Sequence, residues 1–536
     1  MTINTSRRWL MPLVALALAA GACGSSGSSS GGDTDAQGDI IDENAQQAAQ
    51  DQVQNASSTT ADAAAASQAD IATIEDWEAL WETERAAIVK EITDNGWGWN
   101  QETNMVTGPG GFEVDLSQCA SGWDPYGGLG EGKITIGQTI AQSGIAADYG
   151  NIGIGQNVLY EYENANGGIT DSEGKTYTIS TDQRDDAYDP AKTVPLVDEL
   201  LDSEGVFALQ TLGSPNTIKV YDKMNARCVP DPYVMSGHPG WGDPVNHPWT
   251  WGHQMAYNTE AILWGNLIEK NFPDAEEINV AALIIQNDFG KAYEVGFLNY
   301  IATATKKINF SFERVEPTAA VVTNQMTTLA SKNPDVFIGM VGGTQCTQAL
   351  IEAANNGLKD SAKMLFMPSV CKGLNFVSKA AVGGDGAATD GWWVVGGGIK
   401  DFNDPKWADD PWVGWARDLL EKAGKPSEGS SQLGNGFGFG WPIVQSLKIA
   451  AELPGGVSRP NFMIASRMLD MTNPNLLEGI KYNMRAGEDA YPTEGSEFAQ
   501  FDAAAQTWAT DESLGIIELS GKSQPCAWDV STSSCK

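Results

Sequence analysis

The sequence of 536 residues has few basic residues for its length. Lys and Arg together number 33 against 69 Asp and Glu, and the formal net charge is -36. A surface this acidic repels nucleic acid, whose recognition requires a basic face. It also disfavours direct docking on anionic lipid, so a membrane contact would need a covalent anchor. The composition therefore argues against nucleic acid as a partner.

Motifs of catalysis and metal binding are also missing. After residue 70 the chain has no G-x-S-x-G, G-x-x-x-x-G-K-[ST] or H-E-x-x-H pattern, and no C-x-x-C pair occurs anywhere. Histidine is scarce. The chain has three, His238, His247 and His253, and all lie within one short stretch. The one acidic residue in that stretch is Asp243. The stretch could hold a metal or an acid–base site. We favour loop and helix-cap positions instead, with no metal, no cofactor and no enzyme activity.

The N-terminus has the features of an export signal. Arg7 and Arg8 precede an apolar run over residues 9–20, and small residues lead to Cys23. This order is typical of a lipoprotein signal peptide, and the run is shorter than the roughly 20 residues of a membrane span. We expect residues 1–22 to be removed and Cys23 to carry lipid on the outer face of the cell membrane. An ordinary cleaved signal with an incidental cysteine is the alternative.

Two segments separate Cys23 from the main body. Residues 23–70 are rich in Ser, Gly, Ala, Gln and Asp and contain no aromatic residue, so we expect a disordered tether. A helix is expected over residues 74–94, because apolar residues recur on one helical face. These residues are Ile74, Trp77, Trp81, Ile88 and Ile92. The helix would either bind a partner or, as we favour, pack on the main body, and a Gly-rich connector follows to residue 130.

From residue 133 the pattern alternates between strands and helices. Strands are expected at residues 133–139, 176–181, 206–210, 233–236, 279–286, 309–315, 336–341, 363–367 and 392–395. Helices are expected at residues 151–166, 189–201, 215–226, 258–271 and 344–356, and from residues 290 and 321. Repeated βα units with buried strands predict parallel sheets covered by helices, and their number predicts two α/β domains. Ligands of such sheets bind beyond the carboxyl ends of the strands.

Motifs in this region resemble those of type I periplasmic solute-binding proteins, in particular the Leu/Ile/Val-binding group of branched-chain amino acid ABC transporters. They are ITIGQT (134–139), Ser143-Gly144, Asp148-Tyr149-Gly150, ENANGGI (163–169), DPAK (189–192), VAALIIQNDFGKAY (280–293) and SRPNF (458–462). The resemblance covers residues 133–519. It implies two Rossmann-like parallel-sheet lobes, joined by three crossing strands, with a ligand in the cleft. Lobe 1 would comprise residues 131–256 and 393–472, lobe 2 residues 257–392 and 473–520, and a disulfide loop residues 521–536.

The resemblance also implies ligand-binding positions in loops of both lobes. They are Ser143, Tyr149, Ser214, Ser236, His238, Trp241, Phe289 and Thr344. Three segments depart from the family pattern. His238 and Gly240 replace the expected Ala and Thr, Phe289 lacks the hydroxyl of the usual Tyr, and residues 369–371 lack the acid that would bind an ammonium group. Because an unpaired buried ammonium costs on the order of several kcal/mol, these departures favour an aromatic, amide-bearing or largely apolar small molecule over an amino acid.

The cysteine count indicates disulfides. Six cysteines remain beside Cys23, an even number that in an exported protein allows 15 pairings. Cys526 and Cys535 bracket a short polar loop and are expected to pair with each other. The fold implied by the resemblance places Cys346 and Cys371 after neighbouring strands of lobe 2. It then leaves Cys119 to pair with Cys228, which would tie the connector to lobe 1.

The resemblance implies that the protein binds a solute and catalyses no reaction. The protein would be an extracytoplasmic, lipid-anchored solute-binding protein that closes on a small molecule and delivers it to the permease subunits of an ABC importer. One alternative is a ligand-sensing receptor for a signalling partner. The other is an extracellular hydrolase that uses the histidine stretch.

Overall fold

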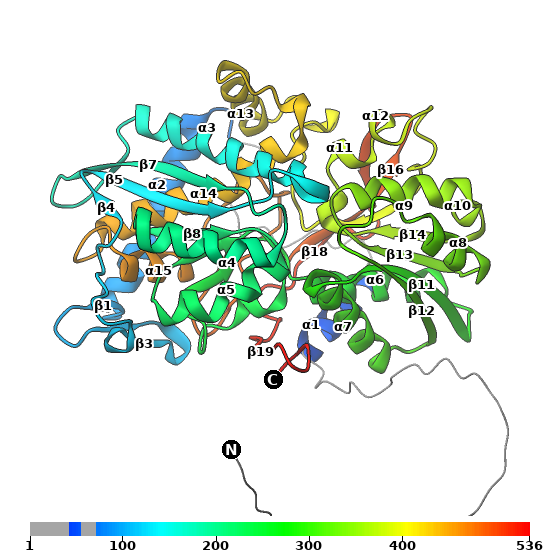
Figure 1. Cartoon of the computed structure of the whole chain (residues 1–536), viewed down its shortest axis with the longest axis horizontal. Coiled ribbons are helices and arrows are strands. Elements are labelled where there is room, and N and C mark those ends of the chain that lie inside the picture. The colour runs from blue at the N-terminus through cyan, green and yellow to red at the C-terminus, as the bar shows by residue number, and fades with distance from the viewer. Residues whose placement is uncertain (1–41, 55–70) are drawn as a thin grey trace, which may run out of the picture. The chain divides into compact units, whose positions relative to one another are not determined.

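The structure is a computed structural model that describes residues 42–54 and 71–536 (Figure 1). The expected signal peptide, Cys23 and most of the expected tether lie outside the described residues. Within those two ranges, no helix has both the length and the apolar character that crossing a bilayer requires.

The first sheet forms the centre of lobe 1. Its strands are β4 (Leu129–Gly130), β5 (Lys133–Thr139), β6 (Ile169–Thr170), β7 (Thr176–Arg184) and β8 (Ala208–Thr211). Strand β5 pairs in parallel with β7 and β8, and Ile134 and Ile136 of β5 are fully buried. The short parallel pair β9 (Asp231–Val234) and β10 (Thr250–Gly252) follows.

Six helices belong to lobe 1. They are α3 (Asn151–Ala165), α4 (Pro190–Glu199), α5 (Ser214–Ala226), α13 (Pro411–Lys422), α14 (Ser431–Glu452) and α15 (Arg459–Arg467). Asp189 caps α4 by accepting a hydrogen bond from the Ala191 N–H, ahead of Pro190 at the helix start. Helices α3 and α14 approach so closely that a Cβ on Gly155 would lie 2.0 Å from the Leu433 carbonyl oxygen. Glycine is therefore required where these two helices cross.

The second sheet forms the centre of lobe 2, and its strand order is β12-β11-β13-β14-β15-β16-β17, with β18 paired to β16. The strands are β11 (Glu277–Ile285), β12 (Lys307–Val315), β13 (Val336–Met340), β14 (Met364–Met367), β15 (Trp393–Val395), β16 (Ser496–Asp502), β17 (Thr507–Thr510) and β18 (Ile516–Ile517). Pairing is parallel from β12 to β15 and antiparallel from β15 onward.

The helices of lobe 2 cover this sheet (Figure 1). They are α6 (Tyr257–Asn271), α7 (Asp288–Thr303), α8 (Thr323–Ser331), α9 (Thr344–Asn355), α10 (Leu358–Ser361), α11 (Leu374–Val377) and α12 (Lys379–Val382). The chain passes between the two lobes three times: between β10 and α6, between β15 and α13, and between α15 and β16. Because β15 pairs with β14 and β16, residues 393–395 belong to lobe 2, and the second passage begins after Val395 rather than before Trp393.

The prediction of a disordered tether is wrong for residues 43–54. They form helix α1 (Glu43–Gln54), in which Ala45, Ala49 and Val53 are fully buried against lobe 2. These small apolar residues recur every fourth position and face α6, so one narrow stripe suffices to dock an otherwise polar helix. Just before it, Asp42 accepts hydrogen bonds from the Gln524 N–H and the Asn258 amide.

Helix α2 (Ile74–Asp94) packs on the main body, as favoured from the sequence. Trp77, Trp81, Ile88 and Ile92 are buried, and the Trp81 ring contacts Trp412 and Trp441 of lobe 1. The expected connector is more ordered than its glycine content indicates. It contains the antiparallel strands β1 (Gly98–Asn100), β2 (Met105–Thr107) and β3 (Glu113–Asp115).

Within the described residues three disulfides are formed, and each joins the pair that was expected. Cys119 bonds to Cys228, and Cys346 bonds to Cys371. Cys526 bonds to Cys535 across a hairpin of β19 (Trp528–Asp529) and β20 (Ser534–Cys535).

Candidate functional site

A cavity of about 100 Å³ lies between the two lobes. Its walls include residues at or shortly after the carboxyl ends of strands in both lobes, as the rule for parallel sheets predicts. These are Leu212 and Gly213 after β8, Met235 after β9, Ile285 at the end of β11, Gly342 and Gly343 after β13, and Ser369 and Val370 after β14. The carboxyl ends of the parallel strands thus meet at one site.

Most of the cavity wall is apolar or aromatic. Its apolar residues include Ile145, Ile152, Leu212, Met235, Ile285, Val370, Ile399 and Leu476. Its aromatic residues are Tyr149, Tyr188, Tyr257, Phe289 and Phe439. The turn before α7 sets the position of Phe289, because the Asn287 side chain accepts hydrogen bonds from the Phe289 and Gly290 N–H groups. Such a wall suits a ligand whose body is apolar.

Polar contacts bridge the two lobes beside the cavity. The Tyr149 hydroxyl of lobe 1 donates to the Val370 carbonyl at 3.1 Å and accepts from the Gly343 N–H at 3.0 Å. Asp148 accepts from the Asn375 amide of lobe 2 at 2.6 Å. Gly343 has φ 60°, and a Cβ there would lie 2.2 Å from the Ile145 carbonyl oxygen. The loop before α9 can therefore approach lobe 1 this closely because residue 343 is glycine.

The charged residues of the cavity wall have partners within the protein. Lys372 is paired with Glu497, and Lys400 with Asp410 at 2.9 Å. Asp401 accepts hydrogen bonds from the Leu374 N–H at 2.7 Å and from the Ser431 hydroxyl at 2.9 Å. Burial raises the pKa of Asp401 above its usual value, while these hydrogen bonds oppose the rise. The wall therefore offers a ligand little unpaired charge.

His253 is the histidine that lines the cavity. Its Nδ1 lies 2.7 Å from the Tyr482 hydroxyl, and burial lowers its pKa to about 3. The ring is consequently neutral at physiological pH and can offer a hydrogen bond without charge.

The eight predicted ligand-binding residues lie in different places. Tyr149 and Phe289 line the cavity. The Ser214 and Ser236 hydroxyls lie 2.8 Å apart, buried behind the lining residues Gly213 and Met235. Two others are exposed outside the lining: Thr344 begins α9 next to Gly343, and Ser143 precedes the turn that carries Tyr149.

His238 and Trp241 lie outside the cavity lining. Both are buried beside the C-terminal hairpin, where the His238 ring centroid is 4.4 Å from that of Trp528 and 5.1 Å from that of Trp241. Burial lowers the pKa of His238 to about 3. The placement follows from the Pro239–Gly242 turn, which carries both residues toward the C-terminal segment.

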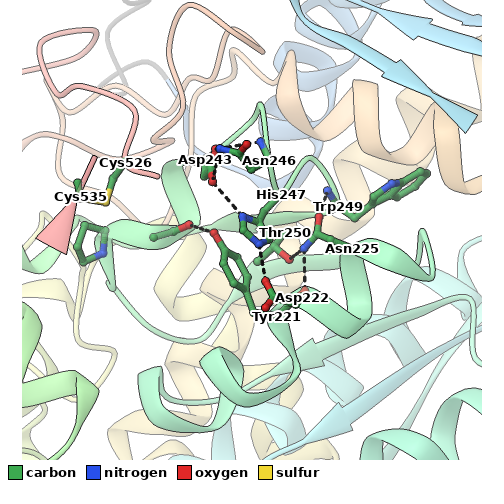
Figure 2. A network of polar contacts seen from close by, with 12 residues as sticks. Tyr221, Asp222, Asn225, Asp243, Asn246, His247, Trp249, Thr250, Cys526 and Cys535 are labelled. Atoms are coloured by element: carbon green, nitrogen blue, oxygen red, sulfur yellow. Dashed lines mark hydrogen bonds and ion pairs between the residues drawn. A yellow bond between two sulfur atoms is a disulfide. The ribbon is translucent and has the colours of Figure 1, made fainter. Parts of the chain in front are cut away.

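His247 belongs to a third environment, a polar network on lobe 1 (Figure 2). Its Nδ1 lies 2.9 Å from an Asp243 carboxylate oxygen and its Nε2 2.9 Å from one of Asp222, while the ring stacks on Tyr221. Burial raises the pKa of Asp243. Hydrogen bonds from His247 and Asn246 together lower it by more than burial raises it, so the pKa lies below its usual value. The histidine stretch is thus divided among three sites. In the part of the chain that the structure describes, no cluster of three or more His, Cys, Asp or Glu side chains is arranged to hold a metal.

Sequence reasoning missed several lining residues. Tyr257 begins α6 directly after a passage between the lobes, Tyr188 follows β7 in a turn with positive φ, and Phe439 lies on α14 within the glycine-rich run. Tyr257 and Tyr188 could have been found from the sequence as aromatic residues shortly after the ends of strands. Phe439 comes from a helix interior, where no strand-end rule applies.

The sequence of residues 133–404, just over half of the chain, matches the family model described as "Periplasmic binding protein". No curated protein matches the chain.

Solved structures share the fold at low sequence identity. A fatty acid ABC transporter substrate-binding protein from Thermomonospora curvata is 18% identical with a TM-score of 0.58, over 73% of this chain and 94% of that chain. A branched chain amino acid ABC transporter protein from Thermus thermophilus with bound valine is 15% identical with a TM-score of 0.60, over 72% and 96%. An ABC transporter solute binding protein from R. palustris in complex with benzoate is 16% identical with a TM-score of 0.55, over 72% and 99%.

The family match and the two-lobed architecture agree with each other and with the motifs quoted above. The chain therefore belongs to the periplasmic binding protein family and shares the type I fold of these solute-binding proteins.

Proposed function

We propose that this protein captures a small, largely apolar or aromatic molecule in the cavity between its lobes and delivers it to the permease of an ABC importer. In this proposal Cys23 carries lipid and holds the protein on the outer face of the cell membrane. The protein binds its solute and changes no bond in it.

The observation that carries the proposal is the chemistry of the cavity wall. Five aromatic side chains and a larger set of aliphatic ones surround the space, while Lys372, Lys400 and Asp401 are engaged by other protein groups. An amino acid would bring an ammonium and a carboxylate that both require charged or strongly polar partners. A solute with an apolar body and one or two polar atoms requires fewer such partners.

The test is a thermal-shift panel of benzyl alcohol, benzamide, octanamide and valine on the purified protein, followed by calorimetric titration. A solute at 100 times its Kd adds about 2.7 kcal/mol to the free energy of unfolding. We expect at least one of the first three to raise the melting temperature and valine to leave it unchanged. A strong shift with valine and none with the others would contradict the proposed ligand class.

A further inference from the structure

A buried carboxylate lies directly behind the lobe 2 wall of the cavity. Glu260, in the first turn of α6, is 0% exposed. Ser369, which lines the cavity, donates to it twice: through its N–H to Oε1 at 2.7 Å and through its hydroxyl to Oε2 at 2.8 Å. The Tyr293 hydroxyl of α7 donates to Oε2 at 2.7 Å. Glu260 therefore reaches the cavity through one side chain, that of Ser369.

The Glu260 carboxylate is bound by the neutral donors of Ser369 and Tyr293. The Tyr293 ring stacks on that of Tyr257, which lines the cavity, with the centroids 4.4 Å apart. Lys372, three residues after Ser369, is bound to Glu497 of β16. Burial raises the pKa of Glu260, and the charge of Glu497 adds to the rise, while the hydrogen bonds from Tyr293 and Ser369 oppose it. The resulting pKa is about 8.

The proton on Glu260 determines what Ser369 presents to a ligand. When the carboxylate is ionised, the Ser369 hydroxyl proton points to Oε2, and the free lone pairs of Oγ can accept a hydrogen bond from the cavity. When Oε2 is protonated, the carboxylic acid donates to Oγ instead, and the hydroxyl proton is free to point into the cavity. The exchange moves one proton on or off Glu260 and breaks no other bond.

We propose that Glu260 is a specificity-determining residue: in its ionised state the carboxylate holds Ser369 as a hydrogen-bond acceptor, and the cavity then selects an apolar or aromatic solute that carries a hydrogen-bond donor such as a hydroxyl or an amide N–H. The inference rests on the proposed function, because it assigns one polar contact within the same cavity. A donor bound to Ser369 favours the ionised carboxylate, so its binding releases a proton wherever Glu260 would otherwise be protonated.

The test compares 3- and 4-methylphenol with toluene in calorimetric titrations of the wild type, Ser369→Ala and Glu260→Gln. At pH 8.5 we expect the wild type to bind one of the hydroxy compounds about tenfold tighter than toluene, the size of one hydrogen bond to a group polarised by a charge. At pH 6 the preference shrinks to less than about threefold, because the proton on Glu260 occupies one Ser369 lone pair and the freed hydroxyl proton then faces the donor of the solute. Both variants lose the preference at both pH values.

Glu269→Gln is the matched control. Glu269 lies on the same helix, accepts from the Tyr300 hydroxyl of α7 at 2.8 Å as Glu260 accepts from Tyr293, and lies outside the cavity lining. Its variant should keep the hydroxyl preference. A preference that survives in Ser369→Ala and Glu260→Gln, or that the wild type lacks, overturns the inference.

A second measurement separates this inference from the proposed function. If none of the aromatic solutes binds, the proposed ligand class is wrong, and the inference is then decided without solute. In carboxyl-labelled protein followed by NMR, Ser369→Ala should raise the pKa of Glu260 because the carboxylate loses a donor. An unchanged pKa would show that Ser369 does not act on Glu260, which also overturns the inference.

Discussion

At the residue scale, the Tyr149 hydroxyl joins chain segments far apart in sequence. It accepts from the Gly343 N–H and donates to the Val370 carbonyl, both in lobe 2, while its ring lines the cavity. One side chain therefore contributes to the wall and to the contact between the lobes. The two roles separate in a variant that keeps the ring and removes the hydroxyl.

Tyr149→Phe should weaken solute binding by about three- to tenfold, because two hydrogen bonds of the closed arrangement are lost while the apolar wall stays intact. Calorimetric titration with the solute chosen by the thermal-shift panel measures the effect. Tyr126→Phe, which removes a half-exposed hydroxyl bonded to the Gly455 carbonyl, is the control and should bind normally. Equal affinities in both variants would exclude a role of the Tyr149 hydroxyl in closure.

His253 gives a prediction about pH. Its native pKa is lowered to about 3 by burial, whereas an unfolded histidine titrates near pH 6.5. Between these values the unfolded state binds the proton and the native state does not, so falling pH lowers the free energy of unfolding by up to about 1.4 kcal/mol per pH unit. His253→Gln removes this contribution, and urea unfolding between pH 6.5 and 4.5 should show a shallower pH dependence. An identical slope in the variant would contradict a buried neutral His253.

The sequence could identify residues at the cavity only where a family motif or a strand end marked them. Tyr149 and Phe289 lie within the family-like motifs at 148–150 and 280–293 and line the cavity, while His238 and Trp241 belong to a glycine-rich loop that turns to the C-terminal hairpin. The difference is a tertiary contact with Trp528, nearly three hundred residues later in the chain. No local pattern encodes such a contact.

At the element scale, the disulfide between Cys346 and Cys371 links two loops of the cavity wall. Cys346 lies in the first turn of α9, after Gly342 and Gly343, and Cys371 follows Ser369 and Val370. Both loops also contact Tyr149. The disulfide therefore holds together the lobe 2 surface on which lobe 1 closes.

Replacing both Cys346 and Cys371 with alanine should lower the free energy of unfolding by about 3 kcal/mol and also weaken solute binding. Replacing Cys526 and Cys535, which lie outside the cavity lining, should cost stability without changing affinity. Thermal unfolding and calorimetric titration of the two double variants provide the comparison. Unchanged affinity in the first pair would show that the loops keep their positions without the disulfide.

The elements themselves were largely predictable, because β11 contains an apolar run at the expected position and α4 begins at a clear cap. Helix α1 was not predictable from composition. Its buried stripe consists of Ala45, Ala49 and Val53, three small residues among polar ones, and it is stable because α6 covers it. Helix α1 therefore forms because of its tertiary packing rather than because of the helix propensity of its residues.

At the scale of the whole molecule, two lobes, each built on its own sheet, are connected by three passages of the chain and enclose an apolar cavity. This arrangement allows a solute to contact both lobes at once, so binding energy can favour the closed arrangement over an open one. Anchoring at Cys23 would keep that event at the membrane surface, where a permease is found.

Cys23→Ala should release the protein from the membrane without changing solute affinity, because lipid attachment requires the cysteine thiol. Fractionation of expressing cells, with intact mass of the detergent-extracted protein, checks this outcome. Wild-type protein that carries no lipid mass would show that Cys23 is not the anchor.

The central claim is that an apolar solute binds between the lobes, and Phe289 tests it most directly. Phe289 lies in the first turn of α7, lines the cavity and is 5% exposed. Calorimetric titration of the wild type and Phe289→Ala with the solute chosen by the thermal-shift panel should give one site per chain and at least about tenfold weaker binding in the variant, as expected for loss of a buried aromatic contact. Equal affinity in the two proteins would contradict binding in this cavity.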